Sequence, residues 1–438
     1  MSGADIRVLG AGPAGLTAAW HAARRGHHVI VQEKEDHPGG MAASFEVAGV
    51  RVDLGSHRLH PSIDPPLLAE LQGLLGADLQ VRPRSGRIRL EGRWIAFPLR
   101  TGDLLRRLSP SFAAGAVRDA LTAPWRHPEA DTFGEVVRAG LGPTVADAFY
   151  GPYARKLWDR DPDALSGELA RRRIQTRSPL AVARRLLGGK STFLYPRRGY
   201  GQISEALADA AAGAGADLRF GEAVTRVEPD AGALVWSTLP LPVLARLTVP
   251  PGPRTALRSR AMLLVYLVLD RPRYTAFDAH YFPSLDVPLS RLSEPKNYRD
   301  DPTDPDDRTV LCAEVPCWAG DELWQTDDAG LGGLVADALG RSDLPAPAHV
   351  GVEVRRLAHV YPVYELGHEA ELANLEDWAA SLPNLITFGR AGLFVPDNAH
   401  HAMAMGAAAA AALGDDGRFD LAGWRASRES FRAHIVED

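Results

Sequence analysis

The chain has 438 residues, of which 45% are hydrophobic and 24% are charged, and its formal net charge is −6. This length allows two or three domains around a large buried core, and the composition is ordinary for a globular protein. The acidic balance argues against a nucleic-acid-binding protein, which needs clustered basic residues. The first residues contain no basic region followed by a long apolar run, and no apolar window reaches membrane-spanning length. We therefore expect neither a signal peptide nor an integral membrane segment.

The two cysteines, Cys312 and Cys317, lie in the stretch LCAEVPCW. Two cysteines cannot form a four-ligand zinc site, and no histidine-rich segment lies nearby. We therefore predict that both are small buried residues in a reducing cytosol. It follows that we expect a cytoplasmic protein without a metal site.

A strand, a glycine-rich turn, a helix and a second strand follow one another in IRVLGAGPAGLTAAWHAARRGHHVIVQEKE. In the G-x-G-x-x-G motif, Gly10 permits a tight turn, Gly12 lets the backbone approach a pyrophosphate, and Gly15 allows close packing of helix on strand. The second strand ends at Glu33, 18 residues after Gly15, where an acid accepts hydrogen bonds from a ribose. This order predicts a dinucleotide site, although it does not distinguish NAD from FAD. The residues predicted to line it are Gly10, Gly12, Pro13, Ala14, Gly15, Glu33 and Lys34.

The stretch that follows, KEDHPGGMAASFEVAGVRVDLGSHRLH, favours FAD. It carries a pair of glycines, then two short strands, then a turn with a further glycine. This pattern resembles the FAD-binding segments of the amine oxidase and protoporphyrinogen oxidase superfamily. Most members of that superfamily have Arg after the glycine pair, whereas this chain has Met41, so one expected contact near the FAD phosphates is missing. The resemblance adds Gly39, Gly40, Met41, Gly55, Ser56 and His57 to the predicted cofactor residues.

Two later segments match the same superfamily pattern. The stretch YPRRGYGQISEALADAAAGAGADLRFGEAVTRVEPD predicts a turn, a helix and two strands. Val224, on the second of these strands, takes the position whose backbone lies against the adenine in FAD enzymes of this type. The stretch GRAGLFVPDNAHHAMAMG resembles the last FAD-binding segment, in which a helix N-terminus faces the pyrimidine edge of the flavin. A reduced flavin carries negative charge near N1 and O2, and helix amides stabilise such a charge. The residues that this match places at the flavin are Gly389, Arg390, His400, His401 and Ala402.

A narrower resemblance joins the chain to UDP-galactopyranose mutases. The segment YGPYARKLWDRDPDALSGELARRRIQTRS is similar to their Y-T-x-K-x-W-G…R-I-P-x-R pattern, DLGSHRLH to their G-P-H-x-F-H pattern, and RLSEPKNY to the wider group. These matches run from residue 5 to about residue 412. The residues on the first pattern are Lys156, Trp158, Arg173 and Arg177.

The chain departs from the mutase pattern at three places. Val395 and Pro396 stand where the mutases carry a tyrosine, His400 replaces an Asp of the flavin turn, and Asp159 replaces the Gly after Trp158. Because the mutase tyrosines help to hold the substrate diphosphate, these departures put a sugar-nucleotide ligand in doubt.

The motif positions predict an α/β protein with a discontinuous FAD-binding Rossmann-like domain of the glutathione reductase type. We assign residues 1–60, 195–250 and 380–413 to this domain, and 61–100 and 251–379 to a mixed-sheet substrate domain. Residues 101–194, rich in Leu, Ala and Arg at helical spacing, read as a helical insertion, and 414–438 as an amphipathic C-terminal helix.

Three side chains are candidates for chemistry. His57 lies in a glycine-flanked turn and titrates near neutral pH, so it suits proton transfer, with a structural histidine as the alternative. His400 lies at a helix start, which favours a neutral imidazole at the flavin, unless the helix amides act alone. Arg173, with Arg177 one helical turn away, suits a diphosphate or carboxylate, against a solvated arginine face as the alternative. The other predicted substrate residues are Lys156, Trp158, Arg291, Tyr298, Tyr361 and Tyr364.

Three functions remain open on this sequence. In the first, oxidised FAD accepts a hydride at N5 from a small polar metabolite that contains a sugar or resembles a sugar nucleotide. In the second, reduced FAD attacks an anomeric carbon through N5, as in the mutases, with no net redox change. In the third, the flavin is bound but not used in catalysis. The lost tyrosine and Asp favour the first, and His57 and the arginines argue against the third. We expect a small-molecule substrate and no nucleic acid, and a homodimer is left open.

Overall fold

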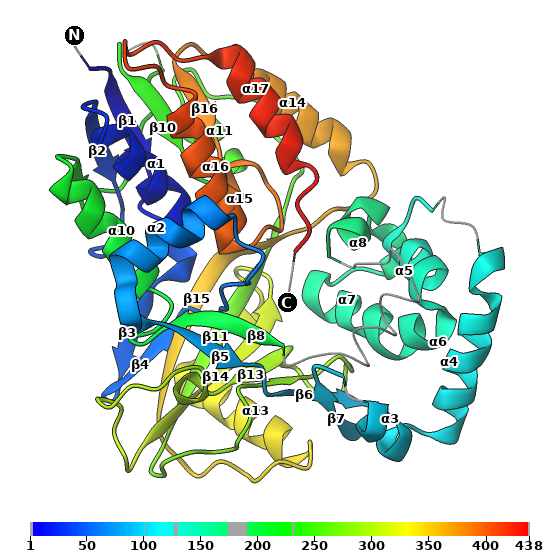
Figure 1. The fold of residues 1–438 in the computed structure, drawn as a ribbon. Coiled ribbons are helices and arrows are strands. Elements are labelled where there is room, and N and C mark those ends of the chain that lie inside the picture. Colours follow the sequence, from blue (N-terminus) through cyan, green and yellow to red (C-terminus); the bar gives the residue numbers. More distant parts are fainter. Residues whose placement is uncertain (1–2, 100, 127–129, 174–190, 230–231, 437–438) are drawn as a thin grey trace.

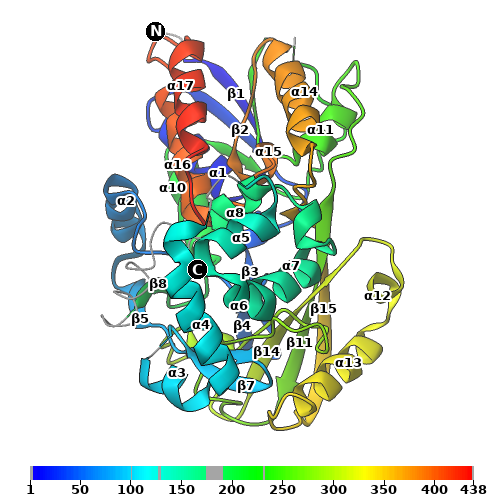
Figure 2. The same cartoon turned by 90° about the vertical axis from the view of Figure 1, so that its right-hand side faces the viewer.

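The computed structural model describes residues 3–99, 101–126, 130–173, 191–229 and 232–436. Figure 1 shows three regions: a parallel sheet with its helices at the upper left, a second sheet below it, and a group of helices at the right. Figure 2 views the molecule from the side of that helical group. The end of the chain returns to the helices, where the Val436 backbone N–H donates to the Arg172 carbonyl oxygen at 2.7 Å.

The first sheet has five parallel strands in the order β16-β10-β1-β2-β9. Helix α1 (Pro13–Ala23) covers it with a run of small buried side chains, and α10 (Gln202–Gly213) and α16 (Ala399–Ala411) pack against α1. Beyond β9 we expected a further strand, but within the described residues this segment makes only an isolated bridge, between Val227 and Thr248. The strands are β1 (Asp5–Leu9), β2 (His28–Gln32), β9 (Asp217–Arg219), β10 (Leu234–Ser237) and β16 (Leu385–Thr387).

The second sheet has seven strands in the order β15-β11-β14-β13-β12-β6-β7, antiparallel except for the β12–β6 pair. Its central strands β11 and β14 read as nearly continuous apolar runs because both of their faces are covered, one by α13 (Asp328–Gly340) and the other by the β3–β4 hairpin. The strands are β6 (Gly86–Leu90), β7 (Arg93–Phe97), β11 (Ser259–Leu269), β12 (Ala279–Tyr281), β13 (Arg291–Ser293), β14 (Thr309–Cys317) and β15 (His349–Pro362), and the hairpin is β3 (Ser44–Val47) with β4 (Val50–Asp53).

The helical insertion packs around a core that includes Phe133, Leu157 and Trp158 and that also takes in Tyr364 and Phe394 from outside the insertion. A capping box between Thr132 and Glu135 starts α5, so the local sequence fixes where this helix begins. The described elements are α3 (Thr101–Arg107), α4 (Pro110–Thr122), η3 (Ala123–Trp125), α5 (Phe133–Leu141), α6 (Pro143–Val145), the π-turn η4 (Ala146–Tyr150), α7 (Gly151–Trp158), η5 (Pro162–Ala164) and α8 (Gly167–Arg173).

The remaining elements connect these regions. A two-stranded sheet joins β5 to β8, and Cys312 and Cys317 are free and buried, as the sequence predicts. Within the described residues, no helix combines the length and the apolar character needed to cross a membrane. The predicted fold class, a Rossmann-like domain with a mixed sheet and a helical insertion, is confirmed. The connecting elements are η1 (Gly40–Ala42), α2 (Pro65–Leu75), η2 (Gly76–Asp78), β5 (Leu79–Pro83), β8 (Thr192–Pro196), α11 (Leu241–Leu247), η6 (Pro295–Asn297), α12 (Glu322–Gln325), α14 (His368–Ser381), α15 (Gly389–Gly392) and α17 (Leu421–Phe431).

Candidate active site

Four distant segments of the chain meet at the carboxyl edge of the five-stranded sheet. Gly10 and Glu33 directly follow β1 and β2, and Thr238 follows β10. Gly389 comes two residues after β16 and has a φ of 78°, a left-handed value that favours glycine. The chain order reverses at β1, which has β2 on one side and β10 on the other. Ligands of open parallel sheets bind at such an edge.

The start of α1 offers backbone amides at this edge. Gly12 is its N-cap residue, no side chain caps the helix, and Pro13 takes the first position, where an N–H is not needed. A Cβ added at Gly15 would lie 2.1 Å from the Gly10 carbonyl oxygen, so helix and strand pack too closely for any other residue. At Gly12 an added Cβ would meet only one oxygen, at 3.9 Å. The uncapped helix start therefore has room for an anionic group such as a pyrophosphate.

Glu33 ties the motif to the neighbouring loops. Its side chain is buried (7% exposed), with Oε2 accepting from the Ala11 N–H at 2.8 Å and Oε1 from the Glu35 N–H at 3.1 Å. The Glu222 N–H donates to the Glu33 carbonyl oxygen at 2.8 Å, which brings the segment leading to Val224 alongside. Val224 is half-buried in this extended segment. The predicted ribose acid and the predicted adenine segment therefore border one another.

The glycine pair after β2 lies against the first turn of α1. The Gly39 N–H donates to the Ala11 carbonyl oxygen at 2.8 Å, and Gly39 and Gly40 have φ values of 125° and 52°. A Cβ on Gly39 would lie 2.7 Å from the Ala43 Cα, so this turn requires glycine. Met41 follows, half-buried in η1. The two glycine-rich turns, the uncapped helix start and the buried acid together fit a dinucleotide cofactor such as FAD.

The turn after β4 positions His57. Its Nε2 lies 2.9 Å from the Leu54 carbonyl oxygen, and because a carbonyl can only accept, Nε2 carries the proton and Nδ1 is left as an acceptor. The ring stacks on Tyr200, with centroids 5.1 Å apart. Burial lowers the pKa of His57, although Asp53 opposes this shift. His57 is therefore neutral near pH 7. Gly55, with a φ of 95°, makes the turn that precedes it.

Glu314 organises this turn from the second sheet. Its Oε1 accepts from the Ser56 N–H at 2.8 Å, and Arg291 donates to both of its carboxylate oxygens, each at 2.9 Å. Burial lowers the pKa of Arg291, but Glu314 reverses this and the net pKa lies well above the ordinary value. We did not predict Glu314 from the sequence, although a lone carboxylate in the apolar strand TVLCAEVPC is a recognisable signal.

A second buried ion pair lies beside the first. Arg58 donates to Asp278 Oδ1 and to the Tyr281 hydroxyl oxygen, both at 3.1 Å, and lies 4.9 Å above the Tyr298 ring. The Tyr298 hydroxyl in turn is 2.5 Å from Ser56 Oγ. Neither Arg58 nor Asp278 was predicted as a site residue, and the stretch SHRLH gives no local signal that Arg58 is buried.

Arg173, at the end of α8, lies beside two aromatic rings. Its guanidinium lies 5.3 Å from the Trp158 ring centroid and 5.4 Å from that of Tyr361. Among the described residues, no carboxylate pairs with it. Arg390 lies over the same Tyr361 ring at 5.6 Å and donates to the Val360 carbonyl oxygen at 2.8 Å. Two arginines thus flank one tyrosine, and the absence of a carboxylate partner for Arg173 within the described residues suits an anionic ligand.

The dinucleotide edge and the polar cluster meet at Gly389 and Arg390. An added Cβ on Gly389 would lie 3.0 Å from the Ala14 Cβ in the first turn of α1. The next side chain, Arg390, reaches Tyr361 in the second sheet. These two adjacent residues therefore connect the predicted cofactor turn to the predicted substrate residues.

Other predicted residues make structural contacts or lie elsewhere. The Lys156 ammonium donates to the carbonyl oxygens of Phe282 and Leu289, and burial lowers its pKa to about 7. The Tyr364 hydroxyl donates to the Phe394 carbonyl oxygen at 2.8 Å, within the core of the insertion. Lys34 is exposed and pairs with Glu35, and Arg177 lies outside the described residues.

The start of α16 carries the histidines of the stretch PDNAHH. His400 is buried, and His401 Nδ1 accepts from the Asn398 N–H at 3.3 Å in a capping box. The His401 ring stacks on His434 at 4.3 Å, and burial, then the neighbouring His400, lowers the pKa of His401 to about 3. His401 is therefore neutral at the positive end of the helix dipole. Ala402 follows in the first turn, buried.

Asp397, His401 and His434 place ligand-type atoms within 4.8 Å of one another. Asp397 is buried and already lies 2.7 Å from His434 Nδ1, and Arg172 is 3.7 Å from its other oxygen. The guanidinium and the helix N-terminus both oppose a second cation here. This cluster instead joins the end of the chain to α16.

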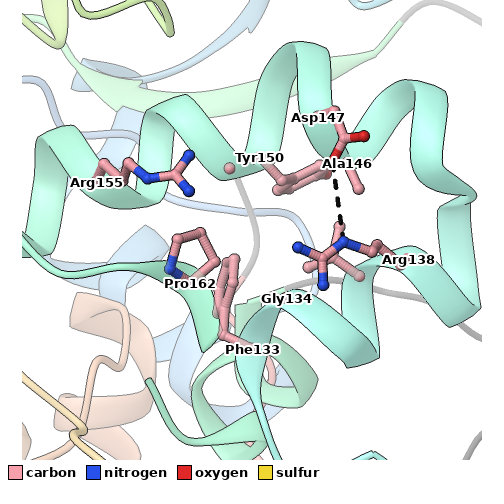
Figure 3. Close-up of a pocket in the computed structure, with 10 residues that line it drawn as sticks. Phe133, Gly134, Arg138, Ala146, Asp147, Tyr150, Arg155 and Pro162 are labelled. Carbon is pink, nitrogen blue, oxygen red and sulfur yellow. Dashed lines mark ion pairs between the residues drawn. The ribbon is translucent and has the colours of Figure 1, made fainter. Parts of the chain in front are cut away.

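A separate cavity of about 200 Å³ lies inside the helical insertion, shown in Figure 3. Phe133 and Pro162 line it together with Arg155 and the ion pair of Arg138 Nε with Asp147 Oδ1, at 3.8 Å. None of the predicted site residues lines this cavity. It is therefore distinct from the cluster around Ser56 and Arg173.

The chain is similar in sequence and in structure to known proteins. Residues 8–73 match a family model described as an NAD(P)-binding Rossmann-like domain. A putative flavin-containing monoamine oxidase of Mycobacterium tuberculosis is 32% identical over 240 residues, 51% of this chain and 51% of that protein. The chain spans about half the length of the curated relatives that it matches most extensively.

Two solved structures share the fold over nearly the whole chain. Reduced UDP-galactopyranose mutase superposes with a TM-score of 0.80 at 20% identity, covering 99% of this chain and 100% of that one. A putative protoporphyrinogen oxidase from Exiguobacterium sp. 255-15 superposes with a TM-score of 0.70 at 19% identity, covering 94% and 99%. This chain has the fold of the FAD amine oxidase-like superfamily. The predicted resemblance to that superfamily is confirmed.

Proposed function

We propose that this protein is an FAD-dependent oxidoreductase acting on a small polar substrate. The observation that carries the proposal is that the adjacent residues Gly389 and Arg390 connect two sites. Gly389 lies against the glycine-rich start of α1, and Arg390 reaches the polar cluster at Tyr361. The match to a flavin-containing monoamine oxidase supports the same class of reaction. A bound FAD would supply a hydride acceptor at N5 for a substrate C–H bond next to nitrogen or oxygen.

The chain's own groups have distinct roles in this proposal. The start of α1 holds the pyrophosphate, Glu33 accepts from the ribose, and Val224 lies at the adenine. The start of α16, with His400 buried and His401 neutral, stabilises negative charge at the pyrimidine edge. These assignments need no titration at neutral pH, since helix amides supply the positive field.

His57 is the proposed proton acceptor, through Nδ1, because its Nε2–H is committed to the Leu54 carbonyl. Arg173 is the proposed anchor for a substrate carboxylate or phosphate, since no described carboxylate neutralises it. We assign no substrate contact to Lys156 or Tyr364 in this proposal, because their polar atoms donate to backbone carbonyl oxygens. A sugar-containing substrate suits the many hydroxyl and guanidinium donors of the cluster.

A redox-neutral sugar isomerisation, as in the mutases, is the second candidate. Arg173 and Trp158 favour it, since both fall on mutase motif positions. The Arg173 guanidinium lies near the rings of Trp158 and Tyr361, where it could bind an anionic substrate group. The isomerisation is opposed by Val395, a buried apolar side chain where the mutases carry a tyrosine. We rank oxidation first for this reason.

The flavin spectrum of the purified protein tests both candidates. The protein is titrated with UDP and UDP-galactose, once oxidised and once after dithionite reduction, and separately with panels of amines and sugars under anaerobic conditions. Bleaching of the flavin by a panel compound supports the oxidoreductase. A saturable shift with UDP-galactose mainly in the reduced form, together with ring isomerisation, supports the mutase. A purified protein that binds no flavin overturns both.

Arg173→Ala, with Arg171→Ala as its matched control, tests the substrate anchor. Arg171 is exposed on the same helix and donates to the Ala130 carbonyl oxygen. We expect Arg173→Ala to weaken the binding affinity for the productive ligand by about ten-fold to a hundred-fold, the range for one charged hydrogen-bonding group. Flavin content should stay unchanged. Equal affinity in Arg173→Ala and the wild type would remove the anchor.

A further inference from the structure

Helix α4, at the rim of the insertion, exposes a stripe of large apolar side chains. Val117 is 61% exposed, Leu121 69% and Trp125 76%. Their spacing of four residues places them on one side of α4 and the η3 turn that continues it. In Figure 1, α4 forms the outer right-hand edge of the molecule, and in Figure 2 it faces the viewer.

The stripe is not the face by which α4 packs on the protein. Phe112 and Asp119 are the buried side chains of this helix, and Asp119 accepts from the Thr144 N–H at 2.7 Å. The helix is thus anchored by one side, and its opposite side is left with Val117 and Leu121 in solvent. Large apolar side chains gathered in this way mark interaction surfaces.

Exposed arginines lie on α4 and on the elements that precede it in the chain. Arg118, 69% exposed, lies within α4 and pairs with Asp119, and Arg107 on α3 pairs with Asp103. Arg106 on α3 and Arg93 on β7 are also exposed. The carboxylates of this stretch are Glu91, Asp103 and Asp119, of which Asp119 is 4% exposed, and the arginines outnumber them. A protein with a formal net charge of −6 therefore presents a locally basic, apolar helix face.

This combination suits a lipid interface better than a second copy of the chain. A stable protein interface buries about 800 Å² and 20–30 residues per partner, whereas the stripe consists of three side chains. Interfacial helices combine Trp and Leu on one face with basic residues on the flanks, and anionic lipid attracts each arginine near the surface. Tryptophan itself favours the headgroup region.

We propose that α4 docks the protein on an anionic lipid bilayer. Val117, Leu121 and Trp125 enter the headgroup region, and the flanking arginines contact lipid phosphates. The contact is peripheral and reversible, because a single short helix face carries it. It goes beyond the proposed oxidoreductase activity and does not depend on it.

Vesicle sedimentation tests the docking surface. The full-length protein is mixed with vesicles of phosphatidylglycerol and phosphatidylcholine in equal parts, and separately with pure phosphatidylcholine. We expect binding to the anionic vesicles that weakens as salt is raised. The variant V117D/L121D should bind about ten-fold or more weakly, because two apolar side chains are lost from the interface.

The control V350D/L366D makes the same chemical change at two exposed apolar residues away from α4, 61% and 52% exposed. It should bind like the wild type, and circular dichroism should show both variants folded. The same binding by V117D/L121D and the control would overturn the proposal, as would no binding by the wild type. So would equal binding to both vesicle types. Wild-type dimers in sedimentation velocity that V117D/L121D abolishes, without vesicle binding, would assign the stripe to a second copy.

Discussion

At the scale of single residues, the protonation of His57 follows from one hydrogen bond. The Leu54 carbonyl fixes the proton on Nε2, and burial keeps the ring neutral. We predict that His57→Ala lowers the rate of flavin reduction by about 10²–10⁴-fold, the usual share of a general base, while flavin content is unchanged. The wild-type rate should show no acid limb near pH 6.5, because the pKa of His57 is lowered. Stopped-flow bleaching of the flavin by the best panel substrate measures both, and full turnover in His57→Ala would disprove the role.

The buried pair of Arg291 and Glu314 leads to a second residue-scale prediction. Removing one partner leaves the other charge buried and unpaired, which costs about 3–5 kcal/mol. We therefore predict that Glu314→Leu destabilises the protein by this amount and that R291M/E314L recovers much of the loss. Urea unfolding measures both variants. The exposed pair of Arg432 and Glu429 is the matched control, and Glu429→Leu should change stability by less than about 1 kcal/mol. Equal stability of the Glu314→Leu variant and the double variant would contradict the argument.

At the scale of elements, the contact of α1 with α16 depends on one glycine. A Cβ added at Gly406 would lie 2.2 Å from the Ala14 carbonyl oxygen, so Gly406→Ala must push α16 away from α1. Because α16 begins at the predicted flavin edge, we predict a loss of about 1–3 kcal/mol in stability together with weaker flavin retention. Gly213→Ala, at the end of α10 with nothing within 4 Å, should instead be neutral or stabilising. Thermal unfolding and flavin absorbance decide the comparison, and equal behaviour of the two variants would refute it.

The elements that the sequence predicts well are those defined by local pattern. Gly10, Gly12 and Gly15 predict the β1–α1 turn by their spacing, because Gly10 has a left-handed φ of 104° and a Cβ at Gly15 would lie 2.1 Å from the Gly10 carbonyl oxygen. The segment before Val227 was expected to be a strand and makes only a bridge, because strand pairing depends on a distant neighbour that a local pattern does not contain.

The site is harder to predict for the same reason. Glu314 reaches Ser56 across 258 positions of the chain, and Arg58 reaches Asp278 across 220. Neither contact can be predicted from the spacing of residues in the local sequence. Lys156 shows the converse: its motif position suggested substrate, but backbone carbonyls from another region receive its ammonium group. Long-range packing therefore decides which polar residues are available for chemistry.

At the scale of the whole molecule, the candidate site is assembled from all three regions. Gly389 and Arg390 come from the parallel-sheet region, Arg291 and Tyr361 from the second sheet, and Arg173 from the insertion. The insertion contributes a site residue on α8 while α4, on its outer rim, carries the proposed lipid-docking stripe. A bilayer contact at α4 would therefore leave the polar cluster away from the membrane surface.

Buried histidines should make the stability of the whole molecule depend on pH. Burial lowers the pKa of His280 to about 3, with Arg87 adding to the shift, while an unfolded histidine titrates near 6.5. Between these values the unfolded chain binds more protons than the folded one, so stability present above pH 6.5 is lost as the pH falls. Each such histidine gives a slope of about 1.4 kcal/mol per pH unit. Urea unfolding at pH 5, 6 and 7 should show His280→Gln with a shallower slope than the wild type. The exposed His28 is the substitution control, and His28→Gln should change stability at pH 7 by no more than about 0.5 kcal/mol. Parallel slopes for wild type and His280→Gln would show that His280 is not held neutral.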